Sequence, residues 1–366
     1  MKSKRKRVVV AMSGGVDSSV AAALLMEEGY EVIGMTMEIW PQPKERMPGG
    51  CCSAETIQDA RQVGERLGIP FYVVNFRDLF AKKVIAYFTT EYLRGRTPNP
   101  CIACNRHLKF AALLEKAVAL EADYLATGHY ARVRYCVERE RYLLYKGEDD
   151  RKDQSYVLYN LTQEQLARII FPLAQYTKAQ IREKAVQLGL KVAHKPESQE
   201  ICFIPDNNYK RFLAERVGSA NFTQGNFVNL QGEIIGRHQG LPFYTVGQRK
   251  GLGLALGYPA YVVALDPEHN TVTIGREDEV FQQGLYANEN NYIAVAKLTE
   301  PMEVQAKIRY SAKPAAAVIS PAGDGRVKVL FDTPQRAITP GQAVVYYQGE
   351  LVVGGGTIDE VINIAL

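Results

Sequence analysis

Residues 7–18 read RVVVAMSGGVDS, and this stretch decides the fold of the N-terminal part of the chain. Three consecutive valines before a glycine pair predict a buried strand that ends in a tight turn. Small and apolar residues then continue as far as Gly29, a typical helix terminator, so a helix is predicted over 18–28. A strand, a glycine turn and a helix in this order begin an α/β unit.

The turn between the predicted strand and helix has the properties of a phosphate-binding loop. Backbone N–H groups and the helix dipole converge on an anion at such a turn, and glycines allow a close approach. The lysine and spacing of a Walker A loop are absent, and the glycines do not form a dinucleotide-binding fingerprint. The segment resembles the pyrophosphate loop (PP-loop) of N-type ATP pyrophosphatases, which adenylate a carbonyl oxygen and release pyrophosphate.

This resemblance implies an ATP site with Mg²⁺. Asp17 would hold Mg²⁺ or orient the loop, and the hydroxyls of Ser13 and Ser18 would donate to the pyrophosphate. Met37, at the end of the second predicted strand, would lie beside the adenosine. The residues assigned to ATP on this basis are Ala11, Met12, Ser13, Gly14, Gly15, Val16, Asp17, Ser18 and Met37. The alternative is a tight structural turn that binds no ligand.

Strand and helix patterns alternate over about the first 200 residues. Further strands are predicted over 31–37, 71–76 and 124–127, and helices over 53–67, 77–93, 108–120 and 177–189. Thr177 and Gln180 form a capping pair at the start of the last helix, and Ser53 is the expected N-cap of the first. This alternation predicts a doubly wound parallel sheet, in a catalytic domain over 1–205.

Short alternating strands replace this pattern after about residue 206. A small β-rich domain is expected over 206–285, with hairpins over 227–235 and 261–274. A C-terminal antiparallel β-barrel is expected over 286–366. Its predicted strands cover 292–297, 304–310, 315–319, 326–331 and 343–347, and Asp324-Gly325 is expected to make a hairpin turn.

Composition narrows the function classes. The apolar fraction of 46% and the charged fraction of 23% are ordinary for a globular protein. No apolar run reaches the roughly 18 residues of a membrane span, and six cysteines are too few for a disulfide scaffold, so a reducing cytoplasm is expected. A net charge of +4 is only weak evidence for a nucleic-acid partner, so any RNA-binding face must be local.

The segment 94–106 is rich in Pro, Asn, Gly and Cys and is predicted to be a functional loop. It carries Cys101 and Cys104, and Cys202 follows much later in the chain. The spacing is compatible with a redox pair or with part of a metal site. Cys51 and Cys52 are adjacent, which seldom allows a comfortable disulfide, and they are assigned no role.

Six motifs in one order resemble the tRNA-specific 2-thiouridylase family over nearly the whole chain. After the PP-loop come Asn99-Pro-Cys-Ile-Ala-Cys-Asn105, Ala126-Thr-Gly-His-Tyr130, Lys152-Asp-Gln-Ser-Tyr156, Ile201-Cys-Phe203 and Tyr244-Thr-Val-Gly-Gln-Arg-Lys-Gly251. The resemblance implies ATP-dependent adenylation of the wobble uridine C2 oxygen in glutamate, lysine and glutamine tRNAs. Sulfur would then come from a persulfide on Cys202, with Cys104 as the nucleophile and a transient disulfide between the two.

The resemblance also implies partners and binding residues. A cysteine desulfurase or a sulfur-relay protein would load Cys202, and Gly128 would contact ATP. The residues implied in tRNA binding are Asn99, Pro100, Cys101, His129, Lys152, Asp153, Gln154, Arg309, Tyr310 and Gln342. From their residue types alone, Arg309 and Tyr310 could equally be a solvated surface pair.

Three alternatives stay open at this point. Cys101, Cys104 and Cys202 could hold an iron–sulfur cluster with one open iron position, which would deliver sulfide without a persulfide. Another adenylating PP-loop enzyme that acts on a small molecule would not need the spaced cysteines. A non-catalytic RNA-binding protein with a vestigial nucleotide loop is disfavoured by the intact Ser-Gly-Gly-Val-Asp-Ser sequence.

Overall fold

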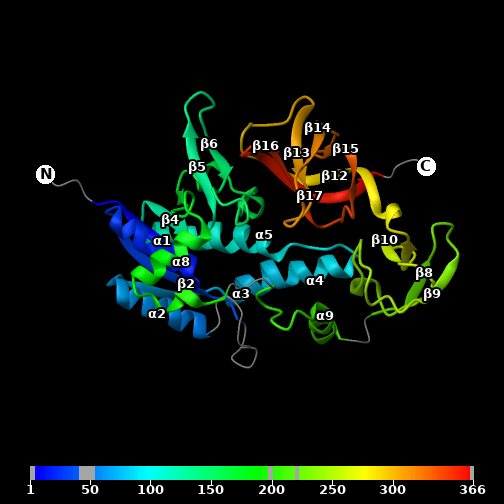
Figure 1. Ribbon diagram of the computed structural model, residues 1–366, viewed down its shortest axis with the longest axis horizontal. Coiled ribbons are helices and arrows are strands. Elements are labelled where there is room, and N and C mark those ends of the chain that lie inside the picture. Colours follow the sequence, from blue (N-terminus) through cyan, green and yellow to red (C-terminus); the bar gives the residue numbers. More distant parts are fainter. Residues whose placement is uncertain (1–4, 41–53, 197–200, 219–221, 363–366) are drawn as a thin grey trace. The chain divides into compact units, whose positions relative to one another are not determined.

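The computed structural model describes residues 5–40, 54–196, 201–218 and 222–362 (Figure 1). The chain divides into two compact units, which are described separately. Unit 1 comprises Met1–Ile85, Pro100–Asn207 and Glu350–Val352, and unit 2 comprises Ala86–Asn99, Asn208–Gly349 and Val353–Leu366. Cys51, Cys52 and Ser53 lie outside the described residues.

A parallel sheet forms the centre of unit 1, with the strand order β3-β2-β1-β4-β7. The strands are β1 (Arg7–Ala11), β2 (Glu31–Glu38), β3 (Phe71–Asn75), β4 (Tyr124–Thr127) and β7 (Ile169–Ile170). In β1, Val9 pairs with Ile33 on one side and with Leu125 on the other. The chain therefore winds outward from β1 in both directions, as the sequence predicts for a doubly wound sheet.

Helices cover both faces of this sheet. Val8, Val10 and Val32 pack in one cluster with α1 (Val16–Glu27), α2 (Ala54–Leu67) and α8 (Lys178–Gln187), and α1 contacts α8 (Figure 1). Successive strand residues point to opposite faces, so Val9, which is fully buried, faces the other layer. There α6 (Leu113–Ala119) contacts β1 and β4.

Two long helical stretches contain π-helical turns. The first runs through α3 (Arg77–Phe80), the π segment η2 (Ala81–Ile85) and α4 (Ala86–Leu93). The second runs through α5 (Pro100–Cys104), the π segment η3 (Asn105–Ala112) and α6. The predicted loop over 94–106 is therefore wrong from Pro100 onward. Proline suits the first position of a helix, so the composition that indicated a loop instead marks a helix start.

The remaining elements of unit 1 include a hairpin that the sequence analysis did not predict. It consists of β5 (Ala131–Cys136) and β6 (Arg141–Lys146), and Tyr145 of β6 pairs with Leu351. Short helical segments follow: η4 (Ser155–Leu158), α7 (Gln163–Leu166) and η5 (Lys191–His194). The predicted capping pair is confirmed, because Thr177 and Gln180 form a capping box at the start of α8.

Unit 2 contains a small β-rich region after α9 (Tyr209–Val217). Its strands, in the order β10-β11-β8-β9, are β8 (Gly225–Val228), β9 (Ile234–His238), β10 (Tyr261–Asp266) and β11 (Thr271–Gly275). Two short helices, η7 (Leu241–Phe243) and η8 (Asp278–Val280), flank β10 and β11 in sequence. Phe227, Val262 and Val272 are fully buried and form the centre of the core of this region.

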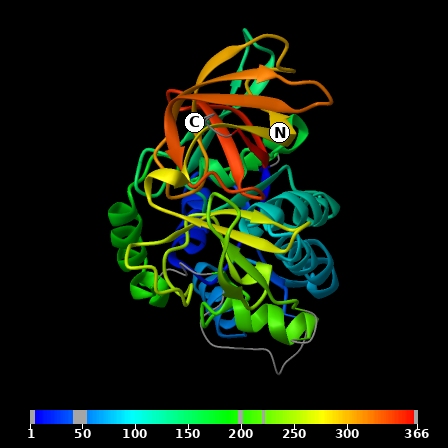
Figure 2. The same cartoon turned by 90° about the vertical axis from the view of Figure 1, so that its right-hand side faces the viewer.

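The C-terminal strands close into an antiparallel barrel (Figure 2). They are β12 (Phe281–Tyr292), β13 (Met302–Lys307), β14 (Ala315–Pro321), β15 (Val327–Arg336), β16 (Ala343–Gln348) and β17 (Leu351–Ile362). Closure results from β12, which pairs with both β15 and β17. Asp324 and Gly325 have φ of 48° and 73°, which fits the predicted hairpin turn between β14 and β15.

The first barrel strand is the one that the sequence analysis misplaced. The strand predicted over 292–297 does not form, because β12 already ends at Tyr292. Polar residues such as Asn288, Asn290 and Asn291 concealed the end of β12 in the hydrophobic pattern.

Across the described residues, no helix is long and apolar enough to cross a membrane.

Candidate active site

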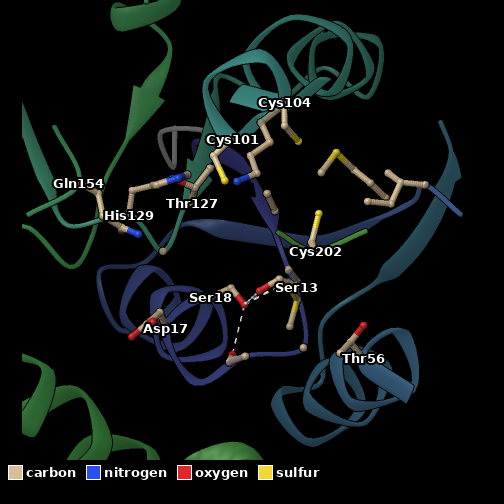
Figure 3. A pocket seen from close by; sticks show the side chains of 18 of the residues that line it. Ser13, Asp17, Ser18, Thr56, Cys101, Cys104, Thr127, His129, Gln154 and Cys202 are labelled. Atoms are coloured by element: carbon tan, nitrogen blue, oxygen red, sulfur yellow. Dashed lines mark hydrogen bonds between the residues drawn. The ribbon is translucent and has the colours of Figure 1, made fainter. Parts of the chain in front are cut away.

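The loop between β1 and α1 is held by its own serines. Ser18 Oγ accepts a hydrogen bond from Ser13 N at 3.2 Å and lies 3.3 Å from the carbonyl oxygen of Gly15, to which it donates. The two hydroxyl oxygens of Ser13 and Ser18 are 3.4 Å apart (Figure 3). Helix α1 begins at Val16, so its unpaired N–H groups point toward this loop. The arrangement is that of an anion-binding turn.

Two glycines allow the loop to pack closely against its neighbours. Gly14 has a φ of +68°, and a Cβ on it would lie 2.1 Å from the carbonyl oxygen of Thr56. Gly128 follows β4, and a Cβ there would lie 2.7 Å from the amide nitrogen of Ser18. Neither position has room for a side chain. The expected ATP residue Gly128 is thus in contact with the loop.

Asp17 is tied to other parts of unit 1. Both of its carboxylate oxygens accept from Lys178 Nζ, each at 2.7 Å, and Oδ1 also accepts from the Tyr130 hydroxyl at 2.7 Å. The Lys178 side chain is only 11% exposed, so the ion pair is poorly screened by solvent. Asp17 thus links the loop to Lys178 and to Tyr130.

A pocket of about 350 Å³ opens beside the loop. The loop and the ends of β2 and β4 form one part of its wall, and the two cysteine segments form another (Figure 3). Its lining contains all ten expected ATP residues: Ala11, Met12, Ser13, Gly14, Gly15, Val16, Asp17, Ser18, Met37 and Gly128. The structure thus places these residues around one cavity at the carboxyl edge of the sheet, the usual ligand position in open α/β sheets.

Three cysteines line the same pocket. Cys101 is exposed, whereas Cys104 and Cys202 are partly buried. Helix α5 carries Cys101 and Cys104. The Cys202 segment is anchored by Phe203, whose ring packs edge-on against Phe80 with centroids 5.6 Å apart. Cys101 and Cys104 precede Cys202 by about 100 residues in the sequence, and the fold brings all three to one cavity.

The cysteines do not form a metal site in this conformation. Among the described residues, no group of three or more His, Cys, Asp or Glu side chains is arranged to hold a metal ion.

His129 is buried beside the pocket and remains neutral. Its side chain is 8% exposed, and its Nδ1 lies 2.7 Å from the hydroxyl oxygen of Thr127. Burial, followed by the nearby charge of Lys109, lowers the pKa of His129 well below its ordinary value of 6.5. A neutral imidazole can exchange hydrogen bonds with a base, but it adds no charge to an anion site.

The expected tRNA residues of unit 1 fall into two groups. Pro100, Cys101, His129 and Gln154 line the pocket, whereas Lys152 and Asp153 are not among the described lining residues. The Asp153 carboxylate is buried and accepts from Gly147 N, Ser155 N and Ser155 Oγ. Asp153 therefore shapes the turn that presents Gln154.

The other expected tRNA residues, Asn99, Arg309, Tyr310 and Gln342, belong to unit 2. Gln342 Nε2 donates to the carbonyl oxygen of Thr97 at 2.9 Å, which supports the segment that leads to Asn99. Arg309 Nη1 donates to the carbonyl oxygen of Arg336, and Tyr310 is 44% exposed just after β13.

Sequence reasoning missed several polar residues of this site. Thr56, Lys109 and Lys195 line the pocket, and Lys178 and Tyr130 fix Asp17. Only Tyr130 lies within a motif singled out in the sequence, and no local pattern relates the lysines to the loop.

Family models and curated proteins both match most of this chain. Family models match residues 6–206 (tRNA methyl transferase HUP domain), 210–276 (tRNA methyl transferase PRC-barrel domain) and 282–358 (Aminomethyltransferase beta-barrel domain). The chain is 59% identical to the tRNA-specific 2-thiouridylase MnmA of Carboxydothermus hydrogenoformans over 360 residues, covering 97% of this chain and 98% of that protein. It is 61% identical to the protein of the same name from Heliobacterium modesticaldum over 356 residues, covering 97% and 92%.

One solved structure, a 4-thiouridine synthetase–RNA complex with bound ATP, shows only distant similarity. It covers 58% of this chain and 50% of its own at 19% identity, with a TM-score of 0.37. The assignment rests instead on the sequence relatives, which match over almost their full length. The chain belongs to the tRNA-specific 2-thiouridylase family.

Proposed function

We propose that this chain makes 2-thiouridine in tRNA through adenylation and sulfur transfer in the single pocket described above. One observation carries the proposal: the PP-loop and the thiols Cys104 and Cys202 line the same cavity. An enzyme that only adenylates a small molecule has no need of these thiols. Their presence therefore favours thiolation over the other PP-loop activities.

In the first step, the C2 oxygen of the target uridine attacks the α-phosphorus of ATP. The new bond joins that oxygen to AMP, and the bond between the α-phosphorus and the bridging oxygen breaks to release pyrophosphate. Loop N–H groups and the hydroxyls of Ser13 and Ser18 are proposed to bind the phosphates, and their position in the pocket lining supports this. The reaction turns a poor leaving group, the oxygen, into a good one.

In the second step, the outer sulfur of a Cys202 persulfide bonds to C2 while AMP leaves. The Cys104 thiolate then attacks Sγ of Cys202, and both electrons of the broken sulfur–sulfur bond stay with the sulfur on the base. The products are 2-thiouridine and a Cys104–Cys202 disulfide. A dithiol reductant reopens the disulfide, which suits a reducing compartment such as the cytoplasm.

The substrate and the sulfur donor belong to the same proposal. The target is the wobble uridine of glutamate, lysine and glutamine tRNAs, and a cysteine desulfurase or a sulfur-relay protein loads Cys202. Pro100, Cys101, His129 and Gln154 are proposed to contact the target base, and their position in the pocket lining supports this role. Asn99, Lys152, Asp153, Arg309, Tyr310 and Gln342 are proposed to contact or present other parts of the tRNA.

The test uses anaerobically purified protein, unmodified glutamate tRNA, Mg-ATP, and a cysteine desulfurase with cysteine. Mass spectrometry measures 2-thiouridine and AMP, and iron is assayed beforehand. We expect iron-free wild type and Cys101→Ser to thiolate, and Cys104→Ser and Cys202→Ser to lose 2-thiouridine below detection. Cys136→Ser is the matched control, because this free cysteine lies on β5, outside the described pocket lining.

The two chemical steps can be separated. Cys202→Ser should still form AMP-linked tRNA in a single turnover, because adenylation requires no thiol. Thiolation by Cys202→Ser, or thiolation only by iron-loaded protein, would contradict the persulfide mechanism. AMP release on a small substrate without any thiolated tRNA would contradict the substrate assignment.

A further inference from the structure

Lys195 lies against the PP-loop and comes from a part of the chain that the loop motif does not include. It follows η5 and lines the pocket, and its Nζ lies 3.4 Å from the carbonyl oxygen of Gly14. The same ammonium forms an ion pair with Asp59 on α2. Lys195 therefore places a positive charge at the edge of the anion-binding turn.

Two residues of helix α2, about one helical turn apart, hold this charge next to the loop. The backbone of Thr56 packs against Gly14, where a Cβ would lie 2.1 Å from the Thr56 carbonyl oxygen. Asp59 is three residues further along, so it lies on the same side of the helix. One helix thus supports the loop backbone and also holds the lysine next to it.

The charge balance of the pocket favours an anion near Lys195. Among the described lining residues, Lys109 and Lys195 are the cations and Asp17 is the carboxylate. Asp17 is already neutralised by Lys178, which is not one of the described lining residues. Lys195 is likewise paired with Asp59, which is also outside the described lining. The three lysines still exceed the two carboxylates by one positive charge, and Lys195 is a cation with a recorded contact to the loop.

The donors of Lys195 are also suited to a ligand. An ammonium group has three N–H donors. Within the described part of the chain, the contacts recorded for Lys195 Nζ are with Asp59 and with the Gly14 carbonyl oxygen. A third donor can therefore reach a ligand oxygen. Asp59 limits the freedom of a flexible side chain, which reduces the entropy lost on binding.

We propose that Lys195 binds the β- and γ-phosphates of ATP, and that Asp59 is the residue that positions it. The inference rests on the proposed ATP-dependent function. When the α-phosphorus is attacked, the bond to the bridging oxygen breaks and the electron pair leaves with pyrophosphate. Lys195 stabilises the negative charge that grows on this leaving group. It therefore favours ATP over AMP, which lacks these phosphates.

Calorimetric titration of the full chain with ATP and with AMP tests this inference. Loss of a charge-assisted hydrogen bond predicts that Lys195→Met binds ATP roughly 10- to 100-fold more weakly. AMP affinity should change less than about 3-fold, because AMP makes no contact with Lys195. Lys195→Arg should retain part of the preference for ATP over AMP. Asp59→Asn should also reduce this preference, but less than Lys195→Met does.

Lys191→Met is the matched control, since Lys191 lies in η5, which Lys195 directly follows, but is exposed to solvent. It should bind both nucleotides like the wild type. Equal weakening of ATP and AMP in Lys195→Met, or a lower melting temperature with unchanged ATP affinity, would show a purely structural role and overturn the inference.

The outcome is distinguishable from failure of the proposed function. If the wild type prefers ATP through Lys195 but thiolates no tRNA, the thiolation assignment fails and the phosphate contact stands. If the wild type thiolates tRNA and Lys195→Met binds ATP normally, only the role of Lys195 is refuted.

Discussion

The pocket edge of the parallel sheet and the C-terminal barrel hold their candidate residues in different ways. At the pocket edge, backbone segments meet so closely that Gly14 and Gly128 have no room for a Cβ. In the barrel, the buried side chains belong to the core, and Tyr310 lies exposed beyond the end of β13. Chemistry at the pocket therefore depends on backbone placement, whereas binding by the barrel depends on side chains at its surface.

The largest expected effect comes from a single methyl group at the pocket edge. In Gly128→Ala, the Cβ would lie 2.7 Å from Ser18 N and 2.8 Å from the carbonyl carbon of Asp17. The loop must then shift, and a displacement of about 1 Å at a reacting centre costs roughly 100-fold. We expect kcat/KM for 2-thiouridine formation to fall by about this factor, as measured by initial rates.

Gly354→Ala is the counterpart in the barrel. Its Cβ would lie 2.3 Å from the carbonyl oxygen of Asn291, so overpacking should lower the free energy of unfolding by about 1–3 kcal/mol. Thiolation by the folded fraction should remain within about 3-fold of wild type, because no candidate catalytic group moves. Equal losses of activity in the two variants would abolish the contrast between the regions.

The next effect concerns the ion pair that orients the loop. Asp17→Asn leaves the Lys178 ammonium, only 11% exposed, facing a neutral amide. We expect a loss of about 1–2 kcal/mol in stability, because one partner of a partly buried pair is removed. A misplaced loop should also lower activity about 10-fold. Denaturant unfolding and initial rates measure the two effects.

Magnesium titration shows which role Asp17 has. If Asp17 orients the loop, the Mg²⁺ concentration for half-maximal activity should not change in Asp17→Asn; a large increase would indicate ligation instead. Lys184→Met is the matched control, because the exposed Lys184–Glu27 pair also bridges α8 and α1. Its loss should cost less than about 0.5 kcal/mol.

A smaller effect is expected at the barrel surface. Tyr310→Ala removes an exposed ring just beyond β13, next to Lys307, whose Nζ lies 5.4 Å from the ring centroid. If this ring stacks on tRNA, KM for tRNA should rise about 3- to 10-fold, while kcat and stability stay near wild type. Val318→Ala, a similarly exposed apolar site on β14, should leave KM for tRNA unchanged.

The smallest effect at neutral pH involves two buried histidines, one in each unit. Burial lowers the pKa of His129 and of His238, and the charge of Lys109 lowers that of His129 further. The unfolded chain therefore binds more protons below about pH 6.5, and stability falls as the pH falls. The contribution of His129 to this loss grows as the pH falls further below 6.5, because its folded-state pKa is lowered well below that value.

Denaturant unfolding between pH 7.5 and 5.5 measures this dependence. His129→Asn should weaken it, and His238→Asn should weaken it less, because His238 Nε2 donates to the Asn270 carbonyl oxygen, which partly restores the pKa of His238. An unchanged pH dependence in His129→Asn would mean that its imidazole is not held neutral by the fold.

Features that depend on neighbouring residues could be predicted from the sequence better than contacts between distant residues. The strand–loop–helix start, the Thr177–Gln180 capping box and the Asp324-Gly325 turn each depend on a few neighbouring residues, and all three form. The loop assigned to 94–106 was wrong from Pro100, since proline, a loop signal in general, is also favoured at the first position of a helix.

The β5–β6 hairpin was missed for a related reason. Its strands carry charged and aromatic residues such as Arg132, Arg134 and Tyr142. The buried apolar positions are few: Ala131 of β5, and Leu143 and Leu144 of β6. Such strands give a weak hydrophobic pattern, because much of their surface faces solvent.

The sequence by itself determined the family, the PP-loop turn and the identity of the chemically capable thiols, because motifs of short range are set by residue order. Only the tertiary structure decided what surrounds them. Lys178 and Asp17 are 161 positions apart, and Lys195 and Gly14 are 181 apart. Contacts over such distances arise when separate helices pack on one sheet, and no spacing in the sequence specifies them.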